Sequence, residues 1–130
     1  MSKRILVVED QEDNRQILRD LLGSTGYEMV EAENGEDALT VAAAEQPDLI
    51  LMDIQLHDVS GLEVTRRLRG DDRCKRIPII AVTAMGWHER EALDSGCDAY
   101  ISKPITILGF LRTVESFLGG AFLASSLQLR

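Results

Sequence analysis

Short apolar runs of β type alternate five times along this chain with segments that have the spacing of amphipathic helices. The predicted strands cover residues 4–8, 27–32, 48–53, 77–83 and 99–102, and the predicted helices cover residues 12–23, 35–46, 61–69, 87–96 and 107–118. Strands and helices that alternate with short connections form parallel strands joined by right-handed crossovers, with helices on both faces of the sheet. The pattern therefore predicts an α/β fold built on a parallel sheet.

Local signals refine this prediction. Residues 49–52, LILM, are apolar throughout, which is typical of a strand that is covered on both faces. Residues 27–32 alternate in polarity, which favours an edge strand with one wetter face. Asn34 is the predicted N-cap of the helix over 35–46.

Length and charge limit the classes of function. The 130 residues fit one domain, and the net charge of −8 disfavours non-specific binding to nucleic acid or to anionic membranes. No apolar run has the length of a signal peptide or of a membrane span, so we expect a cytoplasmic protein with no nucleic-acid or membrane partner. Cys74 and Cys97 lack metal-ligand spacing, and we expect both to be free thiols, at least one of them partly buried.

Polar residues follow the ends of four predicted strands. Glu9 and Asp10 follow the first strand, Asp53 ends the third, Thr83 ends the fourth and Lys103 follows the fifth. Because the carboxyl ends of parallel strands lie along one edge of the sheet, where ligands bind, we expect these side chains to line one pocket. Each has an ordinary alternative when taken alone: a turn residue or helix cap for the acids, a strand residue for Thr83, a solvated lysine for Lys103. Their shared edge favours a functional site.

These residue types suit phosphoryl transfer. Neighbouring carboxylates repel one another unless a cation lies between them, and oxygen ligands without His or Cys suit Mg²⁺. A lysine ammonium balances the charge of a phosphoryl group, and a threonine hydroxyl donates a hydrogen bond to its oxygens. A carboxylate is also a nucleophile that forms an aspartyl phosphate. We therefore interpret Asp53 as a phosphate acceptor.

On these residues, the chain resembles the receiver domain of two-component response regulators, of the single-domain kind. The segments ILVVED, PDLILMDIQL followed by SGLE, PIIAVTA and AYISKP match the motifs of that family in order and spacing, over residues 3–118. Within the family, the chain is most similar to the DivK-type cell-cycle regulators. The resemblance implies a flavodoxin-like (CheY-like) three-layer sandwich, with a five-stranded parallel sheet of order 2-1-3-4-5 and five helices.

The resemblance also implies how phosphate and metal are held. Asp53 would accept a phosphoryl group from a histidine kinase or a histidine phosphotransfer protein. Glu9 and Asp10 would hold Mg²⁺ together with Asp53, and the backbone carbonyl of Gln55 would complete the protein ligands.

Further roles follow from the same resemblance. Thr83 and Lys103 would contact the phosphoryl group, and Tyr100 would be the aromatic residue whose rotation reports the phosphorylated state, unless it serves only for packing. The bond between Lys103 and Pro104 would be cis, as only X–Pro bonds readily are. His57 lies where the family commonly has proline, and we interpret it as a surface loop histidine, with a contact to the site as the alternative.

The output face and the C-terminal tail give two more predictions. Residues 84–95 are slightly fewer than the family pattern has, so the helix over 87–96 should be short or displaced and of low local stability. We expect the surface of this helix, the fifth strand and the fifth helix, with Trp87 and Tyr100, to bind a downstream protein or a second copy of the chain. A core role for Trp87 is the alternative. The apolar tail 119–130 should fold back or contact another chain, with a disordered end as the alternative.

Three rival functions differ from such a switch in what they require. A phosphatase-type hydrolase needs a second acid two residues after the nucleophile, where this chain has Gln55, which cannot act as a general acid. A flavin or nucleotide binder needs a Gly-rich loop after the first strand, and this chain has none there. A pseudo-receiver that works without phosphorylation is disfavoured by the intact acidic set. We therefore predict a switch and not an enzyme, which catalyses only its own phosphorylation and dephosphorylation.

Overall fold

Strands and helices alternate along the whole of the computed structural model, which describes residues 3–84 and 89–119. The elements are β1 (Arg4–Val8), α1 (Glu12–Gly23), β2 (Glu28–Ala32), α2 (Gly35–Glu45), β3 (Leu49–Asp53), α3 (Gly61–Arg69), β4 (Ile79–Ala84), α4 (Glu89–Ser95), β5 (Ala99–Lys103) and α5 (Ile107–Leu118). Each corresponds to a predicted strand or helix, with small shifts at the ends. For example, α2 stops before Gln46, which has a left-handed φ of 48° and precedes Pro47.

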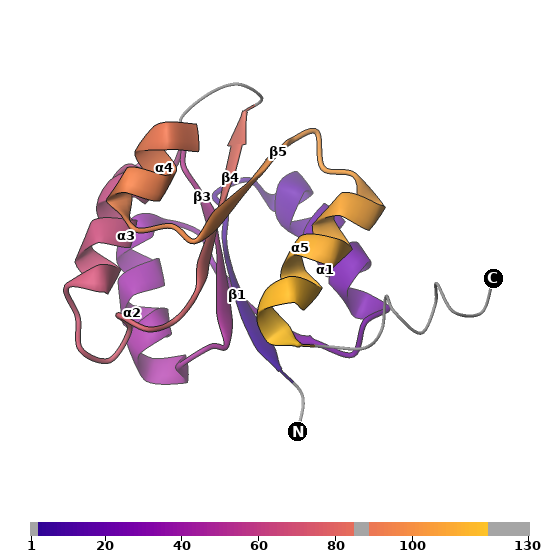
Figure 1. Ribbon diagram of the computed structural model, residues 1–130, viewed down its shortest axis with the longest axis horizontal. Coiled ribbons are helices and arrows are strands. Elements are labelled where there is room, and N and C mark those ends of the chain that lie inside the picture. The colour runs from indigo at the N-terminus through magenta and orange to yellow at the C-terminus, as the bar shows by residue number, and fades with distance from the viewer. Residues whose placement is uncertain (1–2, 85–88, 120–130) are drawn as a thin grey trace.

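The strands form one parallel sheet in the order β2-β1-β3-β4-β5, which confirms the predicted fold class. Figure 1 shows this sheet between two layers of helices. β2 lies at an edge of the sheet, as its alternating polarity indicated. In the centre, Val8 of β1 pairs with Met52 of β3, and Asp53 pairs with Val82 of β4. The strand order reverses at β1 and β3, so the crevice beyond their carboxyl ends is where a ligand site is expected in this architecture.

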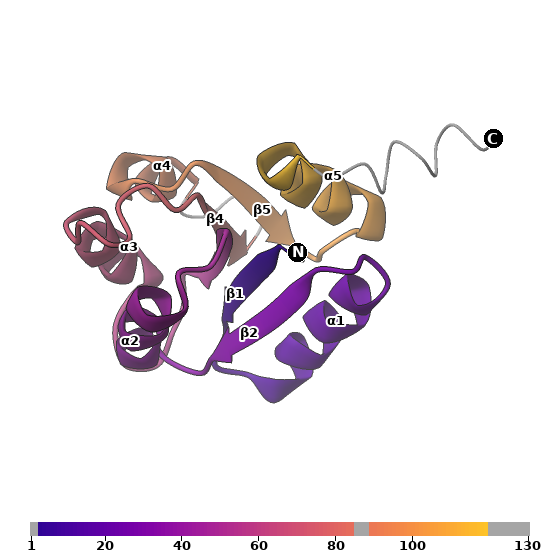
Figure 2. The same cartoon turned by 90° about the horizontal axis from the view of Figure 1, so that it is seen from below.

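Helices cover both faces of the sheet: α2, α3 and α4 lie on one face, and α1 and α5 lie on the other (Figure 2). The strand residues divide in the same way, because successive side chains point to opposite faces. In β3, Ile50 packs in the layer of α2, α3 and α4, whereas Leu49 and Leu51 pack with α1 and α5. This two-sided burial is why LILM is apolar throughout, and it leaves the strand ends as the place for polar groups.

The loop after β3 is fastened to the N-terminus of α2. Asn34 caps this helix, as predicted, by accepting a hydrogen bond from the backbone N–H of Asp37 at 2.8 Å. The carboxylate of Asp58 accepts two further bonds, from the N–H groups of Gly35 (2.9 Å) and Glu36 (3.1 Å). The Gly35 N–H, above all, lowers the pKa of Asp58, because hydrogen bonds to the charged form favour it. The segment between β3 and α3 is thereby held in place.

Several smaller predictions have clear outcomes. Within the described residues, α4 covers only Glu89–Ser95, in line with the short helix expected there. α5 ends before Gly119, whose φ is 67°, and Cys74 and Cys97 are buried free thiols. None of the helices described is both long and apolar enough to cross a membrane. The predictions that concern Trp87 and residues 120–130 lie outside the described residues.

Candidate functional site

The structure brings the five polar side chains from the strand ends together at the carboxyl edge of the sheet. Glu9 and Asp10 directly follow β1, Asp53 is the last residue of β3, Thr83 is the penultimate residue of β4, and Lys103 is the last residue of β5. Glu9, Asp53 and Thr83 are buried, and the side chain of Asp10 is only 6% exposed. Buried polar and charged groups are costly unless they are paired, so the partners of each group indicate what the site binds.

Three of these side chains form a carboxylate cluster. One oxygen from each of Glu9, Asp10 and Asp53 lies within 4.8 Å of the other two. Burial, followed by the charge of Glu9, raises the pKa of Asp53 well above its usual range. Two groups act to lower the pKa of Asp53. They are the ammonium of Lys103 and the backbone N–H of Gln55, which donates to Asp53 Oδ1 at 3.1 Å. The ionised cluster is therefore under repulsive strain that a cation would relieve.

Lys103 supplies part of the compensating charge. Its Nζ lies 3.6 Å from Glu9 Oε1 and 3.8 Å from Asp53 Oδ1, which are ion-pair distances longer than a direct hydrogen bond. The peptide bond to Pro104 that follows is cis. One ammonium between two carboxylates leaves the third acid, Asp10, without a contact to Lys103 among the ion pairs of the described residues.

Three buried oxygens at this edge have no hydrogen-bond partner in the part of the chain that the structure describes: both carboxylate oxygens of Asp10 and the Oγ1 of Thr83. Buried polar atoms in native proteins are nearly always satisfied, so such atoms point to a bound group. Carboxylate oxygens beside other acids suit a hard divalent cation, and a free hydroxyl suits the oxygens of an anion. The donor set therefore fits Mg²⁺ next to a phosphoryl group.

His57 is exposed on the loop after β3 and also contacts the site. Its side chain is 81% exposed, which confirms the predicted surface position. Its Nδ1 nevertheless lies 3.0 Å from Asp10 Oδ2, so the alternative, a contact with the site, holds as well. The two atoms are within ion-pair distance, but their alignment is not that of a hydrogen bond.

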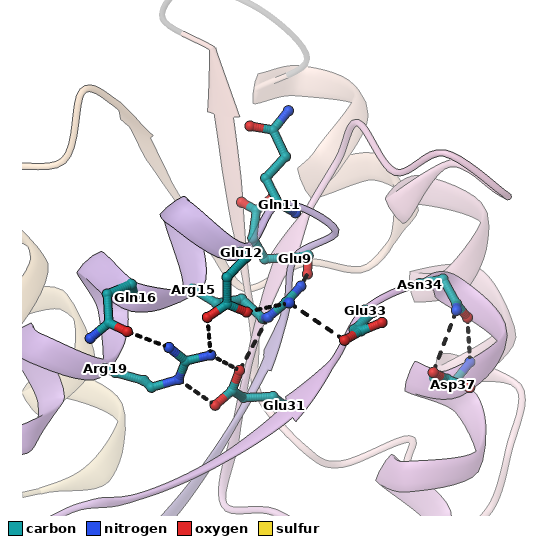
Figure 3. A network of polar contacts seen from close by, with 10 residues as sticks. All are labelled: Glu9, Gln11, Glu12, Arg15, Gln16, Arg19, Glu31, Glu33, Asn34 and Asp37. Carbon is teal, nitrogen blue, oxygen red and sulfur yellow. Dashed lines mark hydrogen bonds and ion pairs between the residues drawn. The ribbon is translucent and has the colours of Figure 1, made fainter.

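The sequence did not indicate the role of Arg15, a buried residue of α1. Its Nη1 donates to the backbone carbonyl of Glu9 at 2.7 Å, its Nη2 pairs with Glu12 at 2.6 Å, and its Nε pairs with Glu31 at 3.1 Å (Figure 3). Arg19, one turn further along, pairs with the same two acids at 2.7 Å in each case, and Glu31 and Glu12 raise its pKa. Of these two arginines, only Arg15 is seen to contact the backbone of Glu9, a member of the carboxylate cluster. An arginine in an amphipathic helix is ordinary, so its sequence position carries no distinctive signal.

Two other predicted residues lie around the cluster. Gln55 is in the loop after β3 with its side chain exposed, and its backbone N–H contacts Asp53 as described above. Tyr100 is exposed on β5, where its neighbours Ala99 and Ile101 pack toward α1 and α5. Tyr100 therefore faces the side of the sheet that carries α4. Ser102, two residues after Tyr100, faces the same side, and so does Thr83, with which Ser102 pairs.

A cavity of about 320 Å³ opens beside the cluster on the face of α1 and α5. Its wall includes Glu9, Asp53 and Lys103 on the polar side and Ile17 and Ile105 on the apolar side.

Comparison with protein families and curated proteins gives consistent matches. The family model for the response regulator receiver domain matches residues 5–115 of this chain. The polar-differentiation response regulator DivK of Brucella anthropi is 50% identical over 123 residues, which are 93% of this chain and 100% of that protein. The protein of the same name from Brucella ovis is 49% identical over 123 residues, which are again 93% of this chain and 100% of that protein.

Solved structures give the same result at lower identity. The receiver domain of sensor histidine kinase PA1611 from Pseudomonas aeruginosa, which has a magnesium ion coordinated in its active site cleft, superposes with a TM-score of 0.85 at 30% identity. The match covers 92% of this chain and 100% of that one. Chemotaxis protein CheY4 of Vibrio cholerae has a TM-score of 0.83 at 25% identity, over 90% of this chain and 99% of that one.

Proposed function

We propose that this chain, which belongs to the response regulator receiver domain family, accepts a phosphoryl group on Asp53 and signals through contacts with other proteins. The observation that supports this most strongly is the environment of Asp53. Its buried carboxylate has Lys103 at 3.8 Å, and at the same edge Thr83 holds a buried hydroxyl with no hydrogen-bond partner among the described residues. A nucleophile, a balancing charge and a hydrogen-bond donor are what phosphoryl transfer to a protein requires.

In the proposed step, a carboxylate oxygen of Asp53 attacks the phosphorus of a phosphohistidine. The new O–P bond forms as the P–N bond breaks, and the electron pair of that bond stays on the imidazole nitrogen of the donor. Lys103 balances charge on the phosphoryl oxygens, and the Oγ1 of Thr83 donates a hydrogen bond to one of them. The attack needs ionised Asp53, whose pKa is raised by burial and Glu9, so charge compensation at the site is part of activation.

We further propose Mg²⁺ as the cofactor. Glu9, Asp10, Asp53 and the backbone carbonyl of Gln55 would hold it, and the unpartnered oxygens of Asp10 support this assignment. The bound ion would offset the combined charge of the carboxylates and the phosphoryl group.

The proposed partners follow from this chemistry. The phosphoryl donor is a histidine kinase or a histidine phosphotransfer protein, which would approach Asp53 through the cavity beside α1. The phosphorylated form would act on a downstream protein, or on a second copy of the chain, through the surface of α4, β5 and α5, where Leu93, Tyr100 and Leu108 are exposed. Such donors and two free thiols fit the reducing cytoplasm that we expect as the location.

A phosphotransfer assay tests this function. Autophosphorylated histidine kinases from the source organism are mixed with wild type, Asp53→Asn and the control Asp72→Asn, which changes an exposed aspartate that pairs with Lys75 between α3 and β4. We expect Mg²⁺-dependent transfer to wild type and to Asp72→Asn, and none to Asp53→Asn. Steady release of phosphate over many turnovers would favour the hydrolase, and the lack of transfer from any donor would favour the pseudo-receiver.

A further inference from the structure

His57 places a ring nitrogen beside Asp10, one of the three carboxylates of the cluster. Its Nδ1 is 3.0 Å from Asp10 Oδ2, although the ring itself is largely exposed. Among the described residues, the ligand atoms that lie within 4.8 Å of one another come from Glu9, Asp10 and Asp53, so the imidazole must turn toward the cluster to join it. Two neighbouring ligands of an octahedral divalent ion, each about 2.1 Å from the metal, are separated by about 3.0 Å. The imidazole nitrogen and the Asp10 oxygen therefore have the separation of two ligands of one ion.

The surrounding loop holds the imidazole close to this position. Asp58, the next residue, is fixed by its bonds to the N–H groups of Gly35 and Glu36. Further along, the N–H of Gly61 donates to the carbonyl of Ile54 at 2.9 Å and closes the loop on itself. Both anchors restrict the backbone at His57, so only its side-chain torsions need to adjust.

The carboxylate that His57 contacts is itself prepared for a ligand. Both oxygens of Asp10 are buried and lack a hydrogen-bond partner in the described chain, and the contact from His57 is not aligned as a hydrogen bond. A metal ion that bound both groups would satisfy the carboxylate and use the imidazole at the same time.

We propose that His57 adds an imidazole ligand to the Glu9–Asp10–Asp53 cluster and shifts its preference toward first-row transition ions such as Co²⁺ and Fe²⁺ relative to Mg²⁺. This inference rests on the proposed function only in that the cluster binds a divalent cation. Mg²⁺ prefers oxygen and gains little from an imidazole, whereas imidazole is a favourable ligand for the transition ions. The chain then carries a metal selectivity that depends on one loop residue.

A simpler role for His57 predicts the opposite behaviour. If the ring only pairs with Asp10, it competes with every cation for that carboxylate. Its removal would then strengthen the binding of Mg²⁺ and Co²⁺ to a similar extent. The two roles therefore differ in the ratio of the two affinities, which does not require any measurement of phosphorylation.

Calorimetric titration of the metal-free protein with Mg²⁺ and with Co²⁺ at about pH 8 distinguishes them, because an imidazole must be neutral to bind a metal ion. The variants are wild type, His57→Ala and, as the matched control, His88→Ala, which removes the other of the two histidines. We expect His57→Ala to weaken Co²⁺ binding on the order of tenfold while Mg²⁺ binding changes less than about twofold. The Co²⁺ complex should also have a paramagnetically shifted imidazole NMR signal that disappears in His57→Ala and persists in His88→Ala.

Three results would overturn the inference: an equal change for both ions, no change for either, or an imidazole signal that survives in His57→Ala. Failure of wild type to bind any divalent cation would contradict the metal site of the proposed function as well. Cation binding that is insensitive to His57 would leave that site intact and contradict only the role of the imidazole.

Discussion

Asp53 is buried at the end of β3 beside a second carboxylate, Glu9, and its ionised form is therefore disfavoured in the metal-free protein. The folded state holds the Asp53 proton more tightly than the unfolded chain does. The free energy of unfolding consequently falls as the pH rises from about 4, the usual Asp pKa, through the raised pKa of the folded state, and the loss is complete above that value. The residue that we propose as the phosphoryl acceptor therefore reduces the stability of the metal-free protein.

The first prediction is that Asp53→Asn stabilises the protein in EDTA, by roughly 1–3 kcal/mol at about pH 8 and by much less at about pH 5. The reason is that the amide cannot ionise, so the cost of a buried charge and the repulsion by Glu9 are both removed. Urea unfolding followed by circular dichroism measures the difference at both pH values. Wild type that is as stable as Asp53→Asn at the higher pH would show that the cluster is not repulsive.

At the scale of elements, α1 is joined to the carboxyl edge of the sheet through Arg15. This buried guanidinium connects the carbonyl of Glu9 with acids on α1 and β2. The acids paired with Arg15 are themselves partly exposed, and such ion pairs stabilise little, but removing Arg15 would leave the buried carbonyl of Glu9 without this donor. Arg15 therefore positions the turn that carries two of the proposed metal ligands.

We predict that Arg15→Ala lowers the free energy of unfolding by roughly 1–3 kcal/mol and weakens Mg²⁺ binding several-fold, because the Glu9–Asp10 turn loses its anchor. Arg19→Ala is the matched control, since it removes pairs with Glu12 and Glu31 but no contact to Glu9. Urea unfolding and calorimetric Mg²⁺ titration measure the two effects. Equal losses of Mg²⁺ affinity in both variants would assign the effect to general stability instead.

The short helix α4 and the neighbouring β5 give another prediction at this scale. A helix of seven described residues has few apolar anchors, so a change at Thr83 can shift it at little cost. Beryllofluoride, a mimic of the phosphoryl group, should change hydrogen exchange in peptides that span residues 84–102. Exchange that changes only around α1 would move the output face away from α4, β5 and α5.

The helices and strands were more predictable from the sequence than the contacts between them. Periodicity was sufficient for the strands, the helices and the Asn34 cap, because these depend on residues close in sequence. The strand order came from the family resemblance, since spacing alone does not specify which strands are neighbours. The contacts of Arg15 with Glu9, of His57 with Asp10 and of Asp58 with the N-terminus of α2 depend on loop geometry in three dimensions, for which one sequence has no periodic signal.

At the scale of the whole molecule, the sheet is buried between two apolar layers, and its carboxyl edge collects charged groups. The site lies at the centre of this edge, beyond β1 and β3, where the strand order reverses. Groups from four strands can then act on one phosphoryl group, and β5 continues from the site toward the proposed output face. We therefore propose that this arrangement directs phosphorylation to Asp53.

Mass spectrometry of the protein after incubation with acetyl phosphate tests that claim most directly. We predict one added phosphoryl group in wild type, located on Asp53, present with Mg²⁺ and absent with EDTA. The Asp53→Asn variant should remain unmodified, while Arg19→Ala, which leaves the site groups in place, should be modified like wild type. Modification of Asp53→Asn at the wild-type rate, or of wild type at a residue other than Asp53, would contradict the account.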